Sequence, residues 1–164
     1  MSMANFLQSI LPVANFVVSL IALWGVYLAW KQINQVNMWN RVKSAADFID
    51  AERVEKLLDK LDAELTRLEL PTRGVLLAAD AERIANDPEA YKAVTRYLTY
   101  FERLAAVINI GAIDNDLAYQ FMVCDVVNAQ ERFSNFISHK RASNNDDEIM
   151  IELDKLAHRW RQSK

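Results

Sequence analysis

Apolar residues dominate the first thirty positions of the chain, and this segment contains no Asp, Glu, Lys or Arg. From Ile10 to Trp30 there are 21 residues, of which only Asn15 and Ser19 are distinctly polar. As a helix this run is about 31 Å long, close to the ~30 Å hydrocarbon thickness of a bilayer. The pattern therefore favours a transmembrane helix over a buried core helix, which seldom stays uncharged on every face.

The flanks of this run predict its orientation. Lys31, Arg41 and Lys43 follow it, whereas no basic side chain precedes it, so a cleaved signal peptide is the weaker alternative. Tryptophan and tyrosine residues, which favour the membrane interface, gather at the same end: Trp24, Tyr27, Trp30 and Trp39. The positive-inside rule predicts a single-pass protein with its N-terminus outside and its C-terminal body in the cytoplasm.

The polar residues of the head follow a helical repeat. Their spacing is 3, 4, 3, 4 along Asn5, Gln8, Pro12, Asn15 and Ser19, which confines these five to an arc of about 80°. Ser9 widens the arc to about 120°. Polar side chains in hydrocarbon need another helix or water. Two interpretations stay open: a helix–helix contact within a homo-oligomer, or a water-filled pore lined by Asn5, Gln8, Asn15 and Ser19 from about four or more subunits.

The remainder of the chain shows helical periodicity and no alternation long enough to predict a strand. Apolar positions recur every three or four residues over 51–68, 91–108 and 149–160. Asp87 followed by Pro88 predicts a helix start, Gly111 a helix end, and Asp114 the cap of the next helix. For that helix we expect an apolar face made of Leu117, Phe121, Cys124, Val127, Phe133 and Phe136, with Cys124 buried.

These patterns predict an all-α protein in which the N-terminal transmembrane helix continues into a cytosolic bundle of about four or five helices. The expected parts are residues 1–36, the span with its juxtamembrane extension, and residues 37–164, the cytosolic helical domain. We expect the assembly to be a homo-oligomer.

Composition narrows the possible chemistry. The chain has 19 basic and 22 acidic residues, a net charge of −3, three glycines, three prolines and one cysteine. These counts exclude a glycine-rich phosphate loop, an internal disulfide and a cysteine-based zinc site, and mild acidity argues against broad nucleic-acid binding. The sequence predicts no catalytic site, no metal site and no cofactor, and we do not expect an enzyme.

One basic cluster could bind a ligand. Arg132 and His139 are seven residues apart, two turns of helix and hence one face, and Lys140 and Arg141 follow directly. Together they could bind an anion such as an oligonucleotide or nucleotide signal. The alternative is a solvated helix end whose cations complement the helix dipole. The segment RFSNFISH also resembles the Arg…His motif of HEPN ribonucleases, with Phe133 in place of the polar residue common after that arginine.

The stretch YLTYFERLAAVINIGAIDNDLAYQFM (Tyr97–Met122), behind one N-terminal span, resembles a bacterial family of uncharacterised membrane proteins that have a single span and a helical cytosolic domain. The layout is also similar to small membrane effectors of antiviral systems, including CRISPR-associated pore formers and nucleotide-gated channels. This resemblance implies an oligomeric inner-membrane pore or ion channel that acts in antiphage defence and is gated through its helical domain. Its implied partners are the lipid bilayer, further copies of the chain and a defence-system protein. A membrane-anchored adaptor without a pore and a membrane-tethered HEPN-like ribonuclease are the alternatives.

Overall fold

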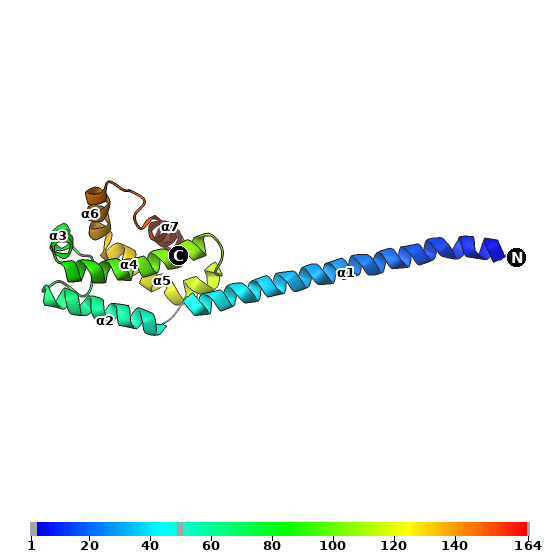
Figure 1. Cartoon of the computed structure of the whole chain (residues 1–164), viewed down its shortest axis with the longest axis horizontal. Helices are drawn as coiled ribbons and strands as arrows, with labels where there is room; N and C mark the ends of the chain where they lie inside the picture. Colours follow the sequence, from blue (N-terminus) through cyan, green and yellow to red (C-terminus); the bar gives the residue numbers. More distant parts are fainter. Residues whose placement is uncertain (1–2, 49–50, 164) are drawn as a thin grey trace. The chain divides into compact units, whose positions relative to one another are not determined.

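The computed structural model describes residues 3–48 and 51–163, and it describes side-chain environments for residues 16, 18–43 and 52–163. Within this part of the chain there are seven helices and no strand, which confirms the all-α prediction. The chain divides into two compact units, residues 1–40 and 41–164. Figure 1 shows the helices of each unit.

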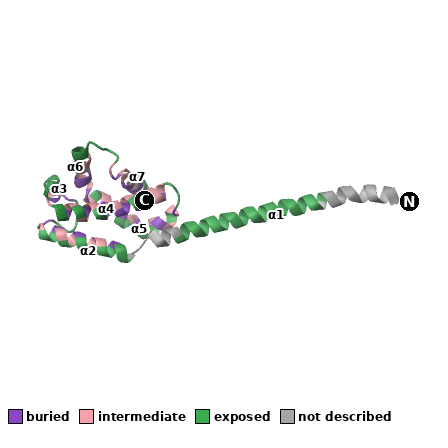
Figure 2. Ribbon diagram, in the orientation of Figure 1, coloured by how far each residue is buried: buried purple, intermediate pink, exposed green. Residues whose placement is uncertain are grey.

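The first unit consists of most of helix α1 (Met3–Phe48), which runs for 46 residues. The helix continues well past Trp30, as the absence of a helix breaker after that residue predicts. Its described side chains are exposed from residue 18 to residue 43 (Figure 2). Large apolar residues are among them, including Ile21, Leu23 and Trp24, which are 64–67% exposed.

Within the described residues, no helix is both long and apolar enough to cross a membrane. Three of the four residues predicted to line a pore, Asn5, Gln8 and Asn15, lie outside the residues whose side chains are described. The fourth, Ser19, is exposed on α1.

The second unit contains six complete helices in its described residues, one or two more than the periodicity predicts. They are α2 (Ala51–Arg67), α3 (Ala78–Asn86), α4 (Pro88–Asn109), α5 (Asn115–Arg132), α6 (Ser134–Asn144) and α7 (Ile151–Gln162). The prediction of four or five helices is wrong chiefly because the helix expected to run from Asp114 through Phe136 is divided into α5 and α6. The chain turns at Phe133, where α5 ends and α6 begins.

Helix α4 is the centre of the second unit and packs against α2, α3, α5 and α7. Figure 2 shows buried residues along much of its length. Of the apolar positions predicted in this helix, Tyr91 is half-buried and the others are buried: Val94, Leu98, Phe101, Ala105 and Ile108. Aromatic pairs surround Phe101, whose ring lies 5.0 Å from the ring of Tyr97 and 5.2 Å from that of Tyr100, centroid to centroid. Their edge-to-face geometry adds to the stabilisation from burial.

The predicted helix starts are confirmed. The Asp87 side chain accepts a hydrogen bond from the Ala90 backbone N–H, and Pro88 occupies the first turn of α4. The Asp114 side chain accepts from the N–H groups of Asp116 and Leu117 at the start of α5. Each carboxylate satisfies backbone donors that have no partner inside the helix and interacts favourably with the helix dipole.

The expected apolar residues from Leu117 to Phe136 are confirmed only in part. Phe133 and Phe136 are fully buried, and Leu117 and Val127 are half-buried against the core. Phe121 is 65% exposed and Cys124 is also exposed, whereas the buried positions of α5 are Ala118, Met122, Val126 and Ala129. Apolar residues occupy more than one face of this helix, so periodicity does not select between them. The small alanine side chains permit close helix packing, and α5 turns this face toward the core.

Replacing Phe101 with alanine is expected to lower the free energy of unfolding by about 3–5 kcal/mol, because it leaves a cavity among close-packed aromatic rings. Denaturant unfolding of the purified protein measures the change. Phe121→Ala removes the same ring from an exposed position and is expected to cost only about 0.5 kcal/mol. Equal losses in the two variants would contradict the assignment of the core.

Asp87 also predicts a pH dependence of stability. A hydrogen bond from Arg67 at 2.6 Å and the Ala90 N–H together hold the pKa of Asp87 below its ordinary value of 3.8. A carboxyl whose folded pKa is depressed contributes stability above its unfolded pKa, and this contribution is lost as the pH falls through the folded pKa. The melting temperature should therefore fall with pH below about 4.

The variant Asp87→Asn retains a capping side chain but loses the ion pair, so the acid-induced fall in melting temperature should be smaller than in the unmodified protein. Asp59→Asn, on the exposed side of α2, provides the control and should leave the pH profile nearly unchanged. An Asp87→Asn profile that matches the unmodified protein would show that this ion pair does not link protonation to folding.

Candidate anion-binding site between α2 and α4

Arg132, predicted to bind an anion, is held by contacts within the chain. It is the last residue of α5, and its side chain is only 14% exposed. Its guanidinium donates to the Pro71 carbonyl at 3.2 Å and lies 3.9 Å from the Asp62 carboxylate. Its own carbonyl accepts from the Leu76 N–H at 3.0 Å. Arg132 thus fastens the α2–α3 connection to the end of α5.

The surroundings of Arg132 form a half-buried electrostatic cluster. Burial lowers the pKa of Arg132, while Asp62 and Tyr97 oppose that shift. Burial, together with the nearby charge of Asp125, raises the pKa of Tyr97 to about 12. Burial also raises the pKa of Asp125. These shifts follow from desolvation of groups packed at the core boundary.

An open cleft of about 370 Å³ lies beside this cluster. It is lined by the connection at 72–75 and by Asn128, Glu131 and Arg132 of α5. The carboxylate of Glu131 contributes a negative charge, so the cleft is less suited to an anion than its two arginines suggest.

The expectation that Arg132 and His139 lie on one continuous helix is wrong. Phe133 separates α5 from α6 with φ −103° and ψ 15°, and its ring is fully buried. Figure 1 shows α6 running at an angle to α5. His139 is exposed on α6. Because the two residues belong to different helices, their seven-residue spacing does not place them on a shared face.

Lys140 and Arg141 also have partners within the chain. Lys140 donates to the Thr95 hydroxyl at 3.3 Å, and its ammonium lies 5.1 Å from the centre of the Tyr91 ring. Arg141 forms an ion pair with Asp154 at 2.6 Å and donates to the Ile149 carbonyl at 2.8 Å. Lys140 therefore fastens α6 to α4, and Arg141 fastens it to α7.

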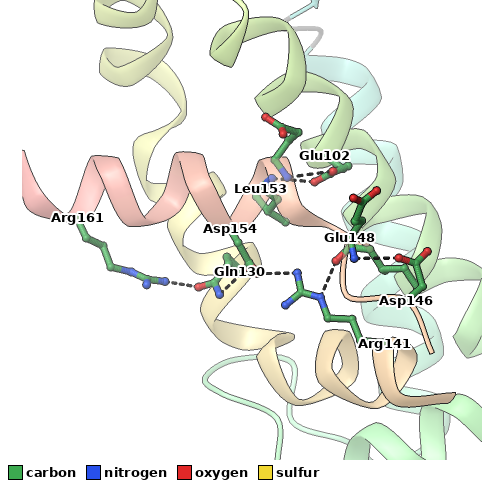
Figure 3. Close-up of polar contacts among 10 residues, drawn as sticks. Glu102, Gln130, Arg141, Asp146, Glu148, Leu153, Asp154 and Arg161 are labelled. Carbon is green, nitrogen blue, oxygen red and sulfur yellow. Dashed lines mark hydrogen bonds and ion pairs between the residues drawn. The ribbon is translucent and has the colours of Figure 1, made fainter. Parts of the chain in front are cut away.

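Figure 3 shows the network around Arg141. The Asp154 carboxylate also accepts from Gln130 of α5 at 2.9 Å, and the Gln130 side-chain oxygen accepts from Arg161. At the start of α7, the Glu102 carboxylate accepts from the Glu152 and Leu153 N–H groups at 3.1 and 2.8 Å. A carboxylate from α4 thus caps a helix whose own N-cap, Met150, provides no side-chain hydrogen bond.

A different group of basic side chains lines a groove between α2 and α4. The groove has a volume of about 470 Å³, and its described lining consists of Arg53, Leu57, Thr95, Arg96, Thr99, Tyr100 and Arg103. Three guanidinium groups and two threonine hydroxyls share this space, and no carboxylate is among these residues. We call this surface the arginine groove.

The arginines of the groove differ in their contacts. The Arg53 guanidinium lies 5.9 Å from the centre of the Tyr100 ring, within the range of a cation–π interaction. Arg96 and Arg103 are exposed, and within the described part of the chain neither side chain has an ion pair. Arginine side chains that are not neutralised by a carboxylate raise the positive potential of a groove.

The spacing of residues in the sequence predicts the α4 side of this groove but not the α2 side. Arg96, Thr99 and Arg103 are spaced by three and four residues, which places them on one face of a helix. Arg53 is 43 residues before Arg96, and only the packing of α2 on α4 brings it to the same groove. No group of three or more histidine, cysteine, aspartate or glutamate side chains suited to a metal ion occurs among the described residues.

The chain matches one protein family over most of its length. The model of a family described as a domain of unknown function, DUF4760, matches residues 12–160. The chain belongs to the DUF4760 family. This one match extends over parts of both structural units. No curated protein and no solved structure matches the chain.

The contacts of Arg141 predict a structural role that a double-mutant cycle measures. Arg141→Gln and Asp154→Asn should show a coupling energy of about 0.5–3 kcal/mol in denaturant unfolding, because the paired side chains are in direct contact and only 22% and 25% exposed. The same cycle on Lys56 and Glu52, whose side chains are 70% and 75% exposed, should give about 0.3–0.5 kcal/mol. A coupling energy near zero for Arg141 and Asp154 would refute the structural role.

Proposed function

We propose that this DUF4760 chain is a self-associating membrane protein that forms a pore or ion channel in the bacterial inner membrane and serves as an effector of antiphage defence. In this proposal the apolar run from Ile10 to Trp30 crosses the membrane as part of α1, with its N-terminus outside. Side chains of this run are described only at residue 16 and from residue 18 on. The helical unit lies in the cytoplasm and controls the pore. The observation that carries the proposal is the apolar surface of α1, which surrounds the helix before the first charged residue, Lys31.

The exposed apolar residues of α1 are distributed around the whole helix. Six of them, each at least 50% exposed, fall within nine positions: Val18, Leu20, Ile21, Leu23, Trp24 and Val26. At 100° per residue, neighbours in this set are no more than about 80° apart around the axis. A single partner helix would cover one side of such a surface, whereas lipid covers all sides. The arrangement therefore favours a bilayer as the main environment.

The polar stripe supports self-association. Asn5, Gln8, Asn15 and Ser19 share one side of α1, and most other residues before Lys31 are apolar. Facing hydrocarbon is costly for these amide and hydroxyl groups, and a ring of copies would turn them toward one another or toward water. One helix cannot enclose a pore, so conduction requires several subunits.

The role in defence and the gating rest on the similarity of layout to antiviral membrane effectors, with an N-terminal span followed by a helical domain. Gating requires a signal that binds the open and closed states with different affinity. The helical unit has basic surfaces that could bind such a signal, and the arginine groove is the one with three arginines and no carboxylate in its described lining.

Two measurements test the proposal. Expression in bacteria should place the protein in the membrane fraction and depolarise the cells, and the purified protein should conduct ions across a planar bilayer. Asn15→Leu with Ser19→Leu should abolish or strongly change the conductance, because it replaces the polar surface of the stripe. Val18→Leu with Ile21→Leu, which changes residues outside the stripe, should leave the conductance near that of the unmodified protein.

The outcomes separate the alternatives. A protein that stays in the membrane as an oligomer but neither depolarises cells nor conducts would be an adaptor without a pore. A protein found only in the soluble fraction would contradict the whole proposal. RNA cleavage that is lost in both Arg132→Ala and His139→Ala would identify a membrane-tethered ribonuclease instead.

A further inference from the structure

We infer that the arginine groove between α2 and α4 binds a phosphate-bearing ligand of about nucleotide size. This inference concerns the helical unit alone and does not require that α1 forms a pore. Two properties of the groove carry it: the convergence of three arginines and two threonines, and the absence of carboxylates from the described lining.

The side chains of the groove have the chemistry that phosphate binding requires. Each guanidinium presents several N–H donors in a plane and binds phosphate oxygens through paired hydrogen bonds. Arg96 and Arg103 lie seven residues apart on α4, with Thr99 between them, so their side chains emerge along one face about two turns apart. Arg53 approaches the same space from α2. Guanidinium and hydroxyl donors from two helices can therefore converge on the oxygens of a bound phosphate group.

Arg96 and Arg103 carry charges that no carboxylate of the described residues neutralises. Several arginines elsewhere in the unit are paired with carboxylates: Arg67 with Glu64 and Asp87, and Arg141 with Asp154. Arg96 and Arg103 differ, since no carboxylate pairs with either of them in the described part of the chain. Like charges on one helix face without a paired carboxylate, as at Arg96 and Arg103, repel one another and destabilise a protein. A bound polyanion would remove this repulsion, which explains a cluster that folding alone does not require.

The volume of the groove suits a ligand larger than a single phosphate. A volume of about 470 Å³ lies within the ~300–1,000 Å³ range of small-molecule sites, and a lone phosphate would leave much of it unfilled. An adjoining groove of about 370 Å³ shares Leu57 and Arg96 and adds Lys60 and Lys92. Its acidic residues, Glu64 and Glu89, make it the less favourable place for phosphate. The ligand is therefore expected to place its phosphates beside Arg96 and Arg103.

The position of the groove gives binding a structural consequence. A ligand held by Arg53 on one side and by Arg96 and Arg103 on the other bridges α2 to α4. Helix α2 is the first helix after α1 in the chain, and α4 is the helix on which the unit is built. Ligand binding should accordingly stabilise the α2–α4 contact against unfolding.

The same chemistry can come from a soluble phosphate compound or from the headgroup of an anionic phospholipid, and the test separates them. The full-length protein in a neutral detergent is titrated with ATP, with inorganic tripolyphosphate, and with short-chain phosphatidylglycerol against short-chain phosphatidylcholine. Binding is followed by thermophoresis, and stabilisation by the shift in melting temperature.

Arg96→Gln with Arg103→Gln removes two charges from the groove. Arg73→Gln with Arg159→Gln removes two charges from exposed positions that do not line it, which gives the same change in net charge. Loss of two charge-assisted contacts is expected to weaken binding by roughly tenfold or more in the groove variant. The control variant should bind within about twofold of the unmodified protein.

Each outcome decides the inference. ATP or tripolyphosphate binding that is lost only in the groove variant supports a soluble ligand, and a preference for phosphatidylglycerol lost only in that variant supports a lipid headgroup. Absence of binding to all four probes, or equal weakening in both variants, overturns the inference. Because binding is measured on the solubilised protein, its failure leaves the proposed pore untouched, and a failure to conduct leaves the groove untouched.

Discussion

Burial of α4 is the constraint on which the rest of the second unit depends. Its buried residues lie within an arc of about 160° around the helix axis, and α2, α3, α5 and α7 each pack against it. Removing this apolar surface from water supplies the main driving force for assembling the unit. The opposite side of α4 contains no buried residue. Thr95, Arg96, Thr99 and Arg103 lie on that side and line the groove, and Arg53 reaches it from α2.

Some polar residues of the unit stabilise helix starts and the junctions between helices, and others line the groove. Asp87, Asp114 and Glu102 satisfy the N–H groups at helix starts, where the backbone lacks internal partners. Arg132 and Arg141 bind backbone carbonyls and carboxylates at the junctions between helices. Basic residues close together in sequence, Arg132, Lys140 and Arg141, thus contact different parts of the chain. Basic residues far apart in sequence, Arg53, Arg96 and Arg103, line one groove.

Several helix starts and buried faces were predictable because they depend on residues close together in the sequence. Asp87 before Pro88, and Asp114 before an apolar helix, act through hydrogen bonds to residues within three positions, so the sequence contains both partners. The apolar faces of α4 and α7 have charged or polar residues opposite them, and their periodicity identified the buried side. The face of α5 was predicted only in part because Phe121 and Met122 are both apolar, and only contact with neighbouring helices selects Met122 for the core.

The sequence by itself determined that the chain is helical, where several helices begin, and that an uncharged apolar segment precedes a highly charged one. These properties depend on hydrogen bonds and side-chain periodicity within a few residues of the chain. Tertiary structure alone decided the break at Phe133, the engagement of Arg132 and Arg141, and the meeting of Arg53 with Arg96 and Arg103. Each of these depends on which helices pack together, because residues tens of positions apart become neighbours only when the apolar faces between them are buried.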